Sequence, residues 1–370
     1  MQKKDQLQAG NNSAKKAFAQ LLLKWNKEKN DRKMPWKGEK DPYKIWLSEI
    51  ILQQTRVEQG LAYYNNFVKT YPNVHKLAKA PDEKVFKLWE GLGYYSRCRN
   101  LLVTARFISK ELKGKFPATY EDIKALKGIG PYTAAAISSF AYNLPHAVVD
   151  GNVFRVLARV FGIDTATDST EGKKLFTALA EELLDKKQPG VYNQAIMDFG
   201  AVICKPAAPL CTTCVLKKQC IAYATQRVNE LPVKGKKIAV RKRWFYYLLL
   251  EYKNEIAIRQ RLDKDIWQDL FEFPMIESRN ELTRKNLLQQ VEKKKWLPVN
   301  GYEVESVSPL FKQQLSHQLI AGQFIKIRLS KKCVAENDWL WMKKSAIDKY
   351  AFPQFINQYL REKKGQQSLF

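Results

Sequence analysis

The hydrophobic pattern of the chain changes in kind near residues 228–243. From Ala14 to about Thr225, apolar residues recur at helical spacing, with short breaks that contain Gly or Pro. Beyond this point, residues 243–261 and 322–337 carry aromatic and β-branched runs with partial alternation, and stretches typical of helices follow them. The pattern predicts an all-α domain followed by an α+β domain.

A chain of 370 residues can bury more than one core, so we expect a multidomain protein. We assign residues 1–13 to a flexible polar tail and residues 14–227 to the helical domain. Residues 228–241 are basic, carry Pro and Gly and lack a sustained apolar period, which indicates an interdomain linker. Residues 242–365 are assigned to the α+β domain.

The charge balance is strongly basic. Sixty-three Lys and Arg residues against 37 Asp and Glu give a formal net charge of +26. Such a field attracts polyanions, so nucleic acid is the leading partner, and it opposes self-association, so we expect a monomer. A basic surface kept only for solubility is the alternative.

Neither a membrane nor a secretory signal is indicated. No apolar stretch reaches the roughly 18 residues that span a bilayer, and MQKKDQLQAGNNSAKK lacks the apolar core of a signal peptide. We therefore expect no membrane partner and a cytoplasmic protein, associated with the nucleoid if the source is bacterial.

Four of the six cysteines crowd together near the end of the predicted helical domain. They follow the spacing C-x6-C-x2-C-x5-C and are Cys204, Cys211, Cys214 and Cys220. Four thiolates on a short loop can enclose a tetrahedral Zn²⁺ or a [4Fe–4S] cluster, and the ligand set alone does not choose between them. Cys98 and Cys333 are isolated, and we predict that they are packing residues.

The segment LKGIGPYTAAAIS, residues 126–138, joins two glycines and a proline to an alanine-rich run. Because Gly and Pro end one helix and the alanine run begins another, the segment predicts a helix-hairpin-helix. The backbone from Gly128 to Gly130 can turn its N–H groups toward a phosphate oxygen, which holds DNA without reading its sequence. An ordinary helix C-cap is the alternative explanation of these glycines.

Two carboxylates stand beside apolar residues at helix positions. In DPYKIWLSEIILQQT, Asp41 caps a predicted helix and Glu49 lies on or near its apolar side. Burial there would raise the pKa of Glu49, so that it could stay protonated and donate a proton. Asp150 follows three apolar residues and precedes a helix. Such a pair suits cleavage of a glycosidic bond, whereas a surface acid at 49 and a plain N-cap at 150 are the alternatives.

Together these features resemble the helix-hairpin-helix DNA glycosylases with an iron–sulfur loop, most closely the adenine DNA glycosylase (MutY) family. The resemblance covers roughly residues 20–225. Its motifs, in order, are PWKGEKDPYKIWLSEIILQQTRVE, LWEGLGYYSRCRNL, LKGIGPYTAAAISS, VVDGNVFRVLARV and the cysteine loop. It implies a [4Fe–4S] cluster rather than zinc, and a double-stranded DNA substrate in which adenine is mispaired with 8-oxoguanine or guanine.

The resemblance also implies roles for single residues. Glu49 matches the acid that protonates adenine, Asp150 the carboxylate that stabilises the oxocarbenium-like sugar, and Tyr132 and Asn152 match residues that support them. Tyr94 matches an aromatic wedge beside the oxidised guanine, a role that base extrusion requires. Further DNA or base contacts are expected from Leu52, Gln53, Gln54, Thr55, Leu92, Gly128 and Gly130.

The second domain resembles the family's Nudix-like C-terminal domain in DIWQDLFEFP (265–274) and LSHQL (315–319). It does not supply the glutamate-rich helix that Nudix hydrolysis requires, so the resemblance implies recognition instead. Ser316 and His317 match the loop that contacts 8-oxoguanine and its phosphate. Leu315 replaces the usual Phe of that loop, and Asp269 replaces a usual Gly.

Two other functions compete with this reading. An endonuclease III-like enzyme would excise oxidised pyrimidines and cleave the strand through a lysine Schiff base, but this chain has Tyr132 at the lysine position, and tyrosine forms no imine. A DNA-binding or iron–sulfur structural protein without catalysis would not need Glu49, Asp150 and Asn152 together.

Overall fold

The computed structural model describes residues 12–235, 239–298, 300–332 and 339–367. The chain divides into two compact units, the first drawn from residues 1–79 and 100–236, the second from residues 80–99 and 237–370. Among the described residues, no helix combines the length and the apolar character needed to cross a bilayer.

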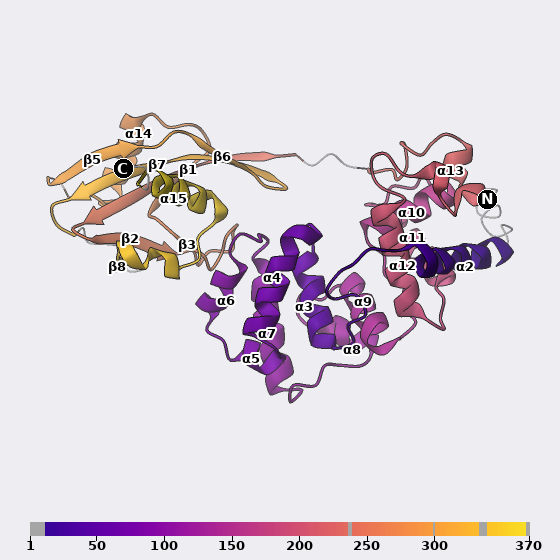
Figure 1. Ribbon diagram of the computed structural model, residues 1–370. Helices are drawn as coiled ribbons and strands as arrows, with labels where there is room; N and C mark the ends of the chain where they lie inside the picture. Colours follow the sequence, from indigo (N-terminus) through magenta and orange to yellow (C-terminus); the bar gives the residue numbers. More distant parts are fainter. Residues whose placement is uncertain (1–11, 236–238, 299, 333–338, 368–370) are drawn as a thin grey trace. The chain divides into compact units, whose positions relative to one another are not determined.

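The first unit is helical (Figure 1). Helix α7 (Ser96–Lys110) continues into it from the second unit. Its other helices are α2 (Asn12–Lys29), α3 (Pro42–Leu52), α4 (Val57–Thr70), α5 (Val74–Ala78), α8 (Tyr120–Ala125), α9 (Pro131–Tyr142), α10 (Gly151–Phe161), α11 (Thr170–Leu183), α12 (Pro189–Val202) and α13 (Ile221–Ala224), with 3-10 turns η1 (Cys211–Thr213) and η2 (Lys217–Gln219).

Local sequence sets the ends of the helices that matter for function. Asp41 caps α3 by accepting a hydrogen bond from the Tyr43 amide, with Pro42 at the first position, as the sequence indicates. Helix α10 begins at the Asp150 cap and ends at Gly162, whose φ of 63° is left-handed. The functional segments therefore start at defined points.

Packing between helices brings distant segments together. Helix α3 packs against α4 and α9, and α12 packs against α2, α9 and α10. Phe18, Phe176 and Phe199 lie fully inside the core that α2, α10, α11 and α12 share. The loop before α9 and the start of α10 are thereby held beside α3, which carries Glu49.

The predicted linker 228–241 is shorter in the structure. Val228, Leu231 and Val233 pack against the helical core. Arg159 Nε donates to the Leu231 carbonyl at 2.9 Å, and the Thr167 amide donates to the Val233 carbonyl at 3.1 Å. At the other end of the domain, α2 begins at Asn12, slightly before the predicted boundary.

The second unit contains a mixed eight-stranded sheet with the order β3-β2-β1-β7-β5, to which β4, β6 and β8 add on β1, β7 and β2. Strand β1 pairs in parallel with β7, and the other pairs are antiparallel. The strands are β1 (Arg241–Tyr252), β2 (Glu255–Gln260), β3 (Phe271–Glu272), β4 (Met275–Ser278), β5 (Tyr302–Val307), β6 (Phe311–Gln314), β7 (Gln318–Leu329) and β8 (Trp339–Lys343).

Helices lie against this sheet because β1 is apolar on both faces. Trp244 and Tyr246 share a core with Leu287 of helix α14 (Arg284–Lys293). The alternate residue Tyr247 packs on Phe355 of helix α15 (Gln354–Gln367). Since neighbouring residues of a strand face opposite sides, α14 and α15 cover different faces of the sheet. A 3-10 turn, η3 (Lys344–Lys349), precedes α15.

Residues 80–99, which contain helix α6 (Asp82–Trp89), group with the sheet. The Phe352 amide donates to Glu90 Oε1 at 2.7 Å, and Lys87 Nζ donates to the Tyr350 carbonyl at 2.9 Å. The sequence predicts that residues 80–99 belong to the helical domain, because their apolar residues recur at helical spacing. Their contacts with residues far along the chain leave no signal in the local sequence.

Candidate active site

One cavity of about 420 Å³ in the helical unit gathers the predicted site residues. It lies at the C-terminal end of α3, the start of α9 and the start of α10, and its volume suits a ligand the size of a nucleobase and sugar. The predicted residues that line it are Glu49, Leu52, Gln53, Gln54, Thr55, Tyr132, Asp150 and Asn152.

Glu49 lies on α3 and is only 7% exposed. Burial raises the pKa of its carboxyl group to about 7; a hydrogen bond with Tyr132 works against this rise, and the charge of Asp150 adds to it. The predicted position on the apolar side is confirmed, and the alternative of a surface acid is excluded. A carboxyl group with this pKa can exist as an acid near neutral pH.

Asp150 is both the N-cap of α10 and a member of the cavity wall. Its Oδ1 accepts from the Val153 amide at 2.8 Å, and its Oδ2 accepts from Asn152 Nδ2 at 2.8 Å. Burial raises the pKa of Asp150, while these two hydrogen bonds favour the ionised form. The cap and the site position are thus compatible, because capping itself supplies donors to the carboxylate.

Tyr132 stands in the first turn of α9. Burial and the neighbouring carboxylates Glu49 and Asp150 hold its pKa well above the ordinary value, so the phenol stays neutral and can donate a hydrogen bond. The hairpin before it requires glycine at Gly128, where φ is 78° and an added Cβ would lie 2.5 Å from Asn100 Cβ. At Gly130 the same atom would meet nothing within 4 Å, which leaves this amide approachable.

Arg155, which sequence reasoning missed, connects the site to the cysteine loop. Its Nη2 donates to Asn152 Oδ1 at 2.8 Å and to the Gly200 carbonyl at 2.7 Å, while Nε donates to the Cys204 carbonyl at 2.7 Å. Arg155 lies one helical turn after Asn152 on α10. This i, i+3 spacing places the two side chains on one face of the helix and could have predicted their contact.

Further cavity residues were also missed, among them Arg32, Trp36, Gln194 and Met197. Asp198, which is fully buried, anchors this wall by accepting from Arg32 Nη1 at 2.8 Å and from Gln194 Nε2 at 3.0 Å. Trp36 belongs to a motif that carried the resemblance, whereas nothing local in the sequence marks Arg32 or Gln194.

Cys204, Cys211, Cys214 and Cys220 all line a second, small cavity in the helical unit. Arg159 Nη1 lies 3.5 Å from Cys204 Sγ, and backbone amides hydrogen-bond to the sulfurs of Cys214 and Cys220. Such donors are typical around thiolates that hold an iron–sulfur cluster. Within the described ranges, no group of three or more His, Cys, Asp or Glu side chains is placed to hold a single metal ion.

Of the two isolated cysteines, only Cys98 lies within the described residues. Cys98 is fully buried, and burial raises the pKa of its thiol, as suits a packing residue. The prediction for Cys333 lies outside the described residues.

The sheet unit holds the other predicted contacts. Tyr94, Ser316 and His317 line a cavity of about 510 Å³, and the Tyr94 and Ser316 hydroxyls share a hydrogen bond. Leu92 is 5% exposed and does not line this cavity. Tyr94 and Gln54 both have a left-handed backbone, with φ of 48° and 56°. This conformation costs energy in residues other than glycine and clusters at functional sites.

The departure at Asp269 has a structural explanation. Its φ of 70° is left-handed, which favours the glycine usual at this position. Arg99 Nη1 contacts Asp269 Oδ2 at 3.2 Å and the Gln268 carbonyl at 2.9 Å, so the replacement gains an ion pair.

Comparison with known proteins places both units. The family model described as HhH-GPD superfamily base excision DNA repair protein matches residues 47–183, and the NUDIX domain model matches residues 245–362. The adenine DNA glycosylase of Buchnera aphidicola subsp. Baizongia pistaciae is 35% identical over 324 residues, or 87% of this chain and 89% of that protein. This chain belongs to the adenine DNA glycosylase family.

Other members of this family and related structures agree. The adenine DNA glycosylase of Mus musculus is 42% identical over 224 residues, which cover 58% of this chain and 43% of that protein. A thermostable thymine-DNA glycosylase has a TM-score of 0.54 at 30% identity over 58% of this chain and 98% of that chain. Endonuclease III trapped on DNA, at 19% identity, has a TM-score of 0.50 over 57% of this chain and 98% of that chain and supports the fold alone.

Membership of the family confirms the predicted fold class, a helix-hairpin-helix domain followed by a Nudix-like α+β domain. The protein is a DNA glycosylase of base excision repair, an enzyme that hydrolyses N-glycosyl bonds in DNA. The alternative of a protein without catalysis is therefore set aside.

Proposed function

We propose that this enzyme removes adenine mispaired with 8-oxoguanine, or with guanine, from duplex DNA and leaves an abasic site in an intact strand. The observation that carries the proposal is the state of Glu49. This acid is buried, hydrogen-bonds to Tyr132 and lies near Asp150, and its pKa is raised to about 7. The relatives named adenine DNA glycosylase support adenine as the released base.

In the proposed mechanism Glu49 is the acid. Since its pKa is about 7, a substantial fraction is protonated at neutral pH, and the proton passes to a ring nitrogen of the extruded adenine. The bond between the sugar C1′ and the base then breaks, and its electron pair leaves with adenine. Positive charge develops on the sugar as a result.

Asp150 faces that charge in its ionised form, with one oxygen held by the Val153 amide and the other by Asn152. Water then adds to C1′, and its proton restores the acid form of Glu49, so that one water is consumed for each adenine and abasic site formed. Tyr132 holds Glu49 by a hydrogen bond and, because a phenol forms no imine, offers no route to strand cleavage.

We further propose that Cys204, Cys211, Cys214 and Cys220 hold a [4Fe–4S] cluster. Four thiol donors around one cavity and the amide hydrogen bonds to sulfur support a four-thiolate metal site, and the family resemblance favours a cluster over zinc. When bound, the cluster would cross-link the loop that contains η1 and η2. Arg155 and Arg159 then supply positive charge close to the Cys204 thiolate.

For the base opposite adenine, we propose that Ser316 and His317 contact 8-oxoguanine and that Tyr94 inserts beside it. Their shared cavity and the exposure of Tyr94, 45%, support these roles. We also propose a monomeric enzyme of the cytoplasm, at the nucleoid in a bacterium, for which the net charge of +26 is the support.

Two duplexes test the reaction, one with adenine opposite 8-oxoguanine and one with thymine glycol. We expect adenine release from the first, with strand breaks appearing only after alkali. Strong activity on thymine glycol, or an adduct trapped by borohydride on a lysine, would contradict the proposal.

Visible absorption of the purified protein tests the cluster. A broad charge-transfer band that disappears on oxidative loss of iron is expected, together with four iron atoms per chain by metal analysis. A colourless protein that contains zinc would contradict it.

A further inference from the structure

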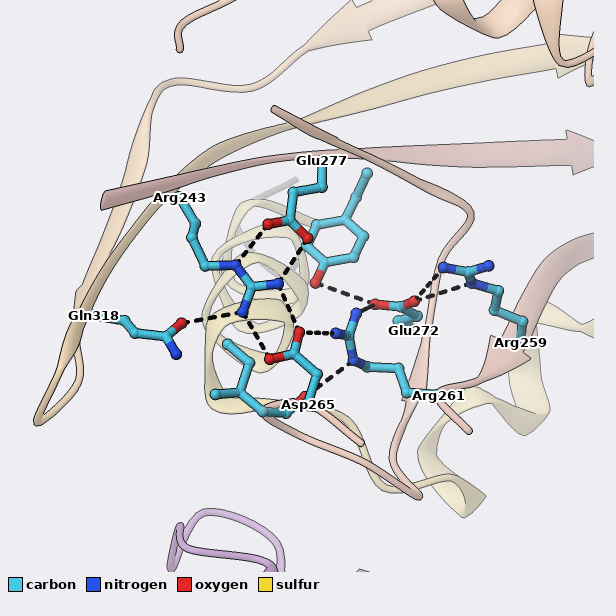
Figure 2. Close-up of polar contacts among 9 residues, drawn as sticks. Arg243, Arg259, Arg261, Asp265, Glu272, Glu277 and Gln318 are labelled. Carbon is cyan, nitrogen blue, oxygen red and sulfur yellow. Dashed lines mark hydrogen bonds and ion pairs between the residues drawn. The ribbon is translucent and has the colours of Figure 1, made fainter. Parts of the chain in front are cut away.

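A polar cluster in the sheet unit has Arg243 at its centre (Figure 2). Arg243 lies near the start of β1 and is 6% exposed. Its Nε and Nη2 each donate to Glu277 at 2.7 Å, its Nη1 and Nη2 donate to Asp265 at 2.9 and 2.6 Å, and Nη1 also donates to Gln318 Oε1 at 3.1 Å. A guanidinium has five N–H donors, so each of them has an acceptor here.

The three acceptors come from separate parts of the unit. Glu277 lies on β4, and Asp265 lies in the loop between β2 and β3. Gln318 is the first residue of β7, directly after the Leu315–His317 turn. One side chain therefore ties a strand, a loop and a turn to β1.

Two of these acceptors line the cavity that contains Ser316 and His317. Asp265 stands on the wall formed by residues 265–267, and Gln318 on the wall formed by residues 313–318. Arg243 joins the two walls through Nη1, which donates to both Asp265 and Gln318. The distance between the two walls is consequently set by the guanidinium of Arg243, which is planar and rigid.

The turn is already held at its base by the pairing of β6 with β7 and by the hydrogen bond between the Ser316 and Tyr94 hydroxyls. The Leu315 amide donates to the Gln318 carbonyl at 2.7 Å, and the Arg241 amide donates to the His317 carbonyl at 3.0 Å. The side chains of Ser316 and His317 are exposed. These backbone bonds fix the shape of the turn, while the Arg243–Gln318 contact adds a link to the opposite wall.

The opposite wall is rigid in turn. Arg261 Nη2 donates to Asp265 Oδ2 at 3.1 Å, and Arg261 Nη1 donates to the fully buried Glu272 at 2.5 Å. Arg259 also binds Glu272 but touches none of the three acceptors of Arg243. It therefore offers a matched control from the same cluster.

We propose that Arg243 is a positioning residue for recognition of the base opposite adenine, because it fixes Ser316 and His317 relative to the Asp265–Trp267 wall. The inference rests on the proposed role of that cavity in reading 8-oxoguanine. Adenine release opposite guanine and the proton transfer from Glu49 do not depend on Arg243.

The test uses the full-length protein as wild type, Arg243→Lys and the control Arg259→Lys. Lysine keeps the charge but offers a point donor that cannot bridge both walls. Single-turnover adenine release is measured on duplexes with 8-oxoguanine or guanine opposite adenine. We expect Arg243→Lys to lower the rate ratio between the two duplexes about tenfold through slower release opposite 8-oxoguanine, with Arg259→Lys near wild type.

Amide hydrogen exchange separates positioning from loss of folding. In Arg243→Lys, faster exchange is expected at the Leu315 and Arg241 amides, with the rest of the sheet as protected as in Arg259→Lys. Faster exchange across the whole sheet would assign Arg243 a purely structural role and overturn the inference.

The rate ratio also separates this inference from the proposed function. If wild type favours 8-oxoguanine and Arg243→Lys keeps the wild-type ratio, the inference is wrong while the proposed function stands. If wild type shows no preference for 8-oxoguanine, the proposed recognition fails, and the exchange at Leu315 still decides whether Arg243 holds the turn.

Discussion

The two units bury acids in opposite ways. In the helical unit, Glu49 is held by a neutral phenol, and its pKa rises to about 7. In the sheet unit, Asp265 binds two arginines; burial acts to raise its pKa, but Arg243 and Arg261 outweigh burial and hold it below the ordinary value. An acid kept away from cations can transfer a proton, whereas an acid saturated by arginine can only hold structure.

The contrast extends to stability against pH. The pKa of Glu49 is higher in the folded chain than in the unfolded one, so its contribution is fully present below pH 4.5 and is lost as the pH rises through about 7. The pKa of Asp265 is lower in the folded chain, so its contribution is present at neutral pH and is lost as the pH falls below its ordinary value of 3.8. The helical unit therefore loses the Glu49 contribution as the pH rises toward 7, whereas the sheet unit loses the Asp265 contribution only in acid.

The largest effect that would test this contrast is expected from Glu49→Gln. The amide keeps the shape but has no acidic proton, so single-turnover adenine release should fall by roughly a thousandfold or more while duplex affinity changes little. Glu58→Gln, at an exposed site on α4, serves as the control and should behave as wild type. Full activity of Glu49→Gln would remove Glu49 from the acid role.

A smaller effect of a different kind is expected from Glu272→Gln. It leaves Arg261 and Arg259 without their buried anion, which should lower the free energy of unfolding of the sheet unit by about 3 kcal/mol. Global amide exchange of sheet residues measures this. The rate of adenine release opposite guanine should stay near the wild-type rate. A large fall in that rate would show that Glu272 also supports the chemistry of the helical unit.

The control for that variant is Glu255→Gln, which removes a solvent-accessible ion pair with Lys332 in the same unit. Because both partners are accessible to solvent, no measurable change in sheet exchange is expected.

The smallest effect is expected from Tyr132→Phe, and it appears as a pH shift. Its hydrogen bond lowers the pKa of Glu49, so its removal should raise that pKa. The profile of adenine release falls at high pH as Glu49 loses its proton, and this descending limb should move to higher pH. An unchanged limb would show that Tyr132 does not act on Glu49.

Part of the cavity lining could be predicted from local sequence signals. Glu49 lies on the apolar side of a capped helix and Asp150 stands at a helix start, so both are visible within a short window, whereas Asn152 followed from the family resemblance. The Glu49–Tyr132 bond follows only from the packing of α3 on α9. That Glu49 and Tyr132 belong to one site could be predicted from the family resemblance but not from the periodicity of the sequence.

Other features have no local signal. Arg243 and Gln318 meet because β1 and β7 pair in parallel across a long intervening segment, and Asp265 joins them from the loop between β2 and β3. Charged residues at strand ends are usually interpreted as surface residues. Residues 228–235 carry apolar residues without a period because they form a turn followed by irregular chain, which packs through single side chains and backbone hydrogen bonds. Such packing is invisible to a search for helices or strands.

The parallel pairing of β1 with β7 also bears on how the protein is made. Arg241 pairs with Gln318, so a ribosome must complete β7 before β1 gains its central neighbour. The helical unit, drawn from residues 1–79 and 100–236, has its whole sequence available well before that moment. Until β7 emerges, β1 can pair with β2 and β4 on one edge only, so its other edge stays open to pairing with the strands of other nascent chains.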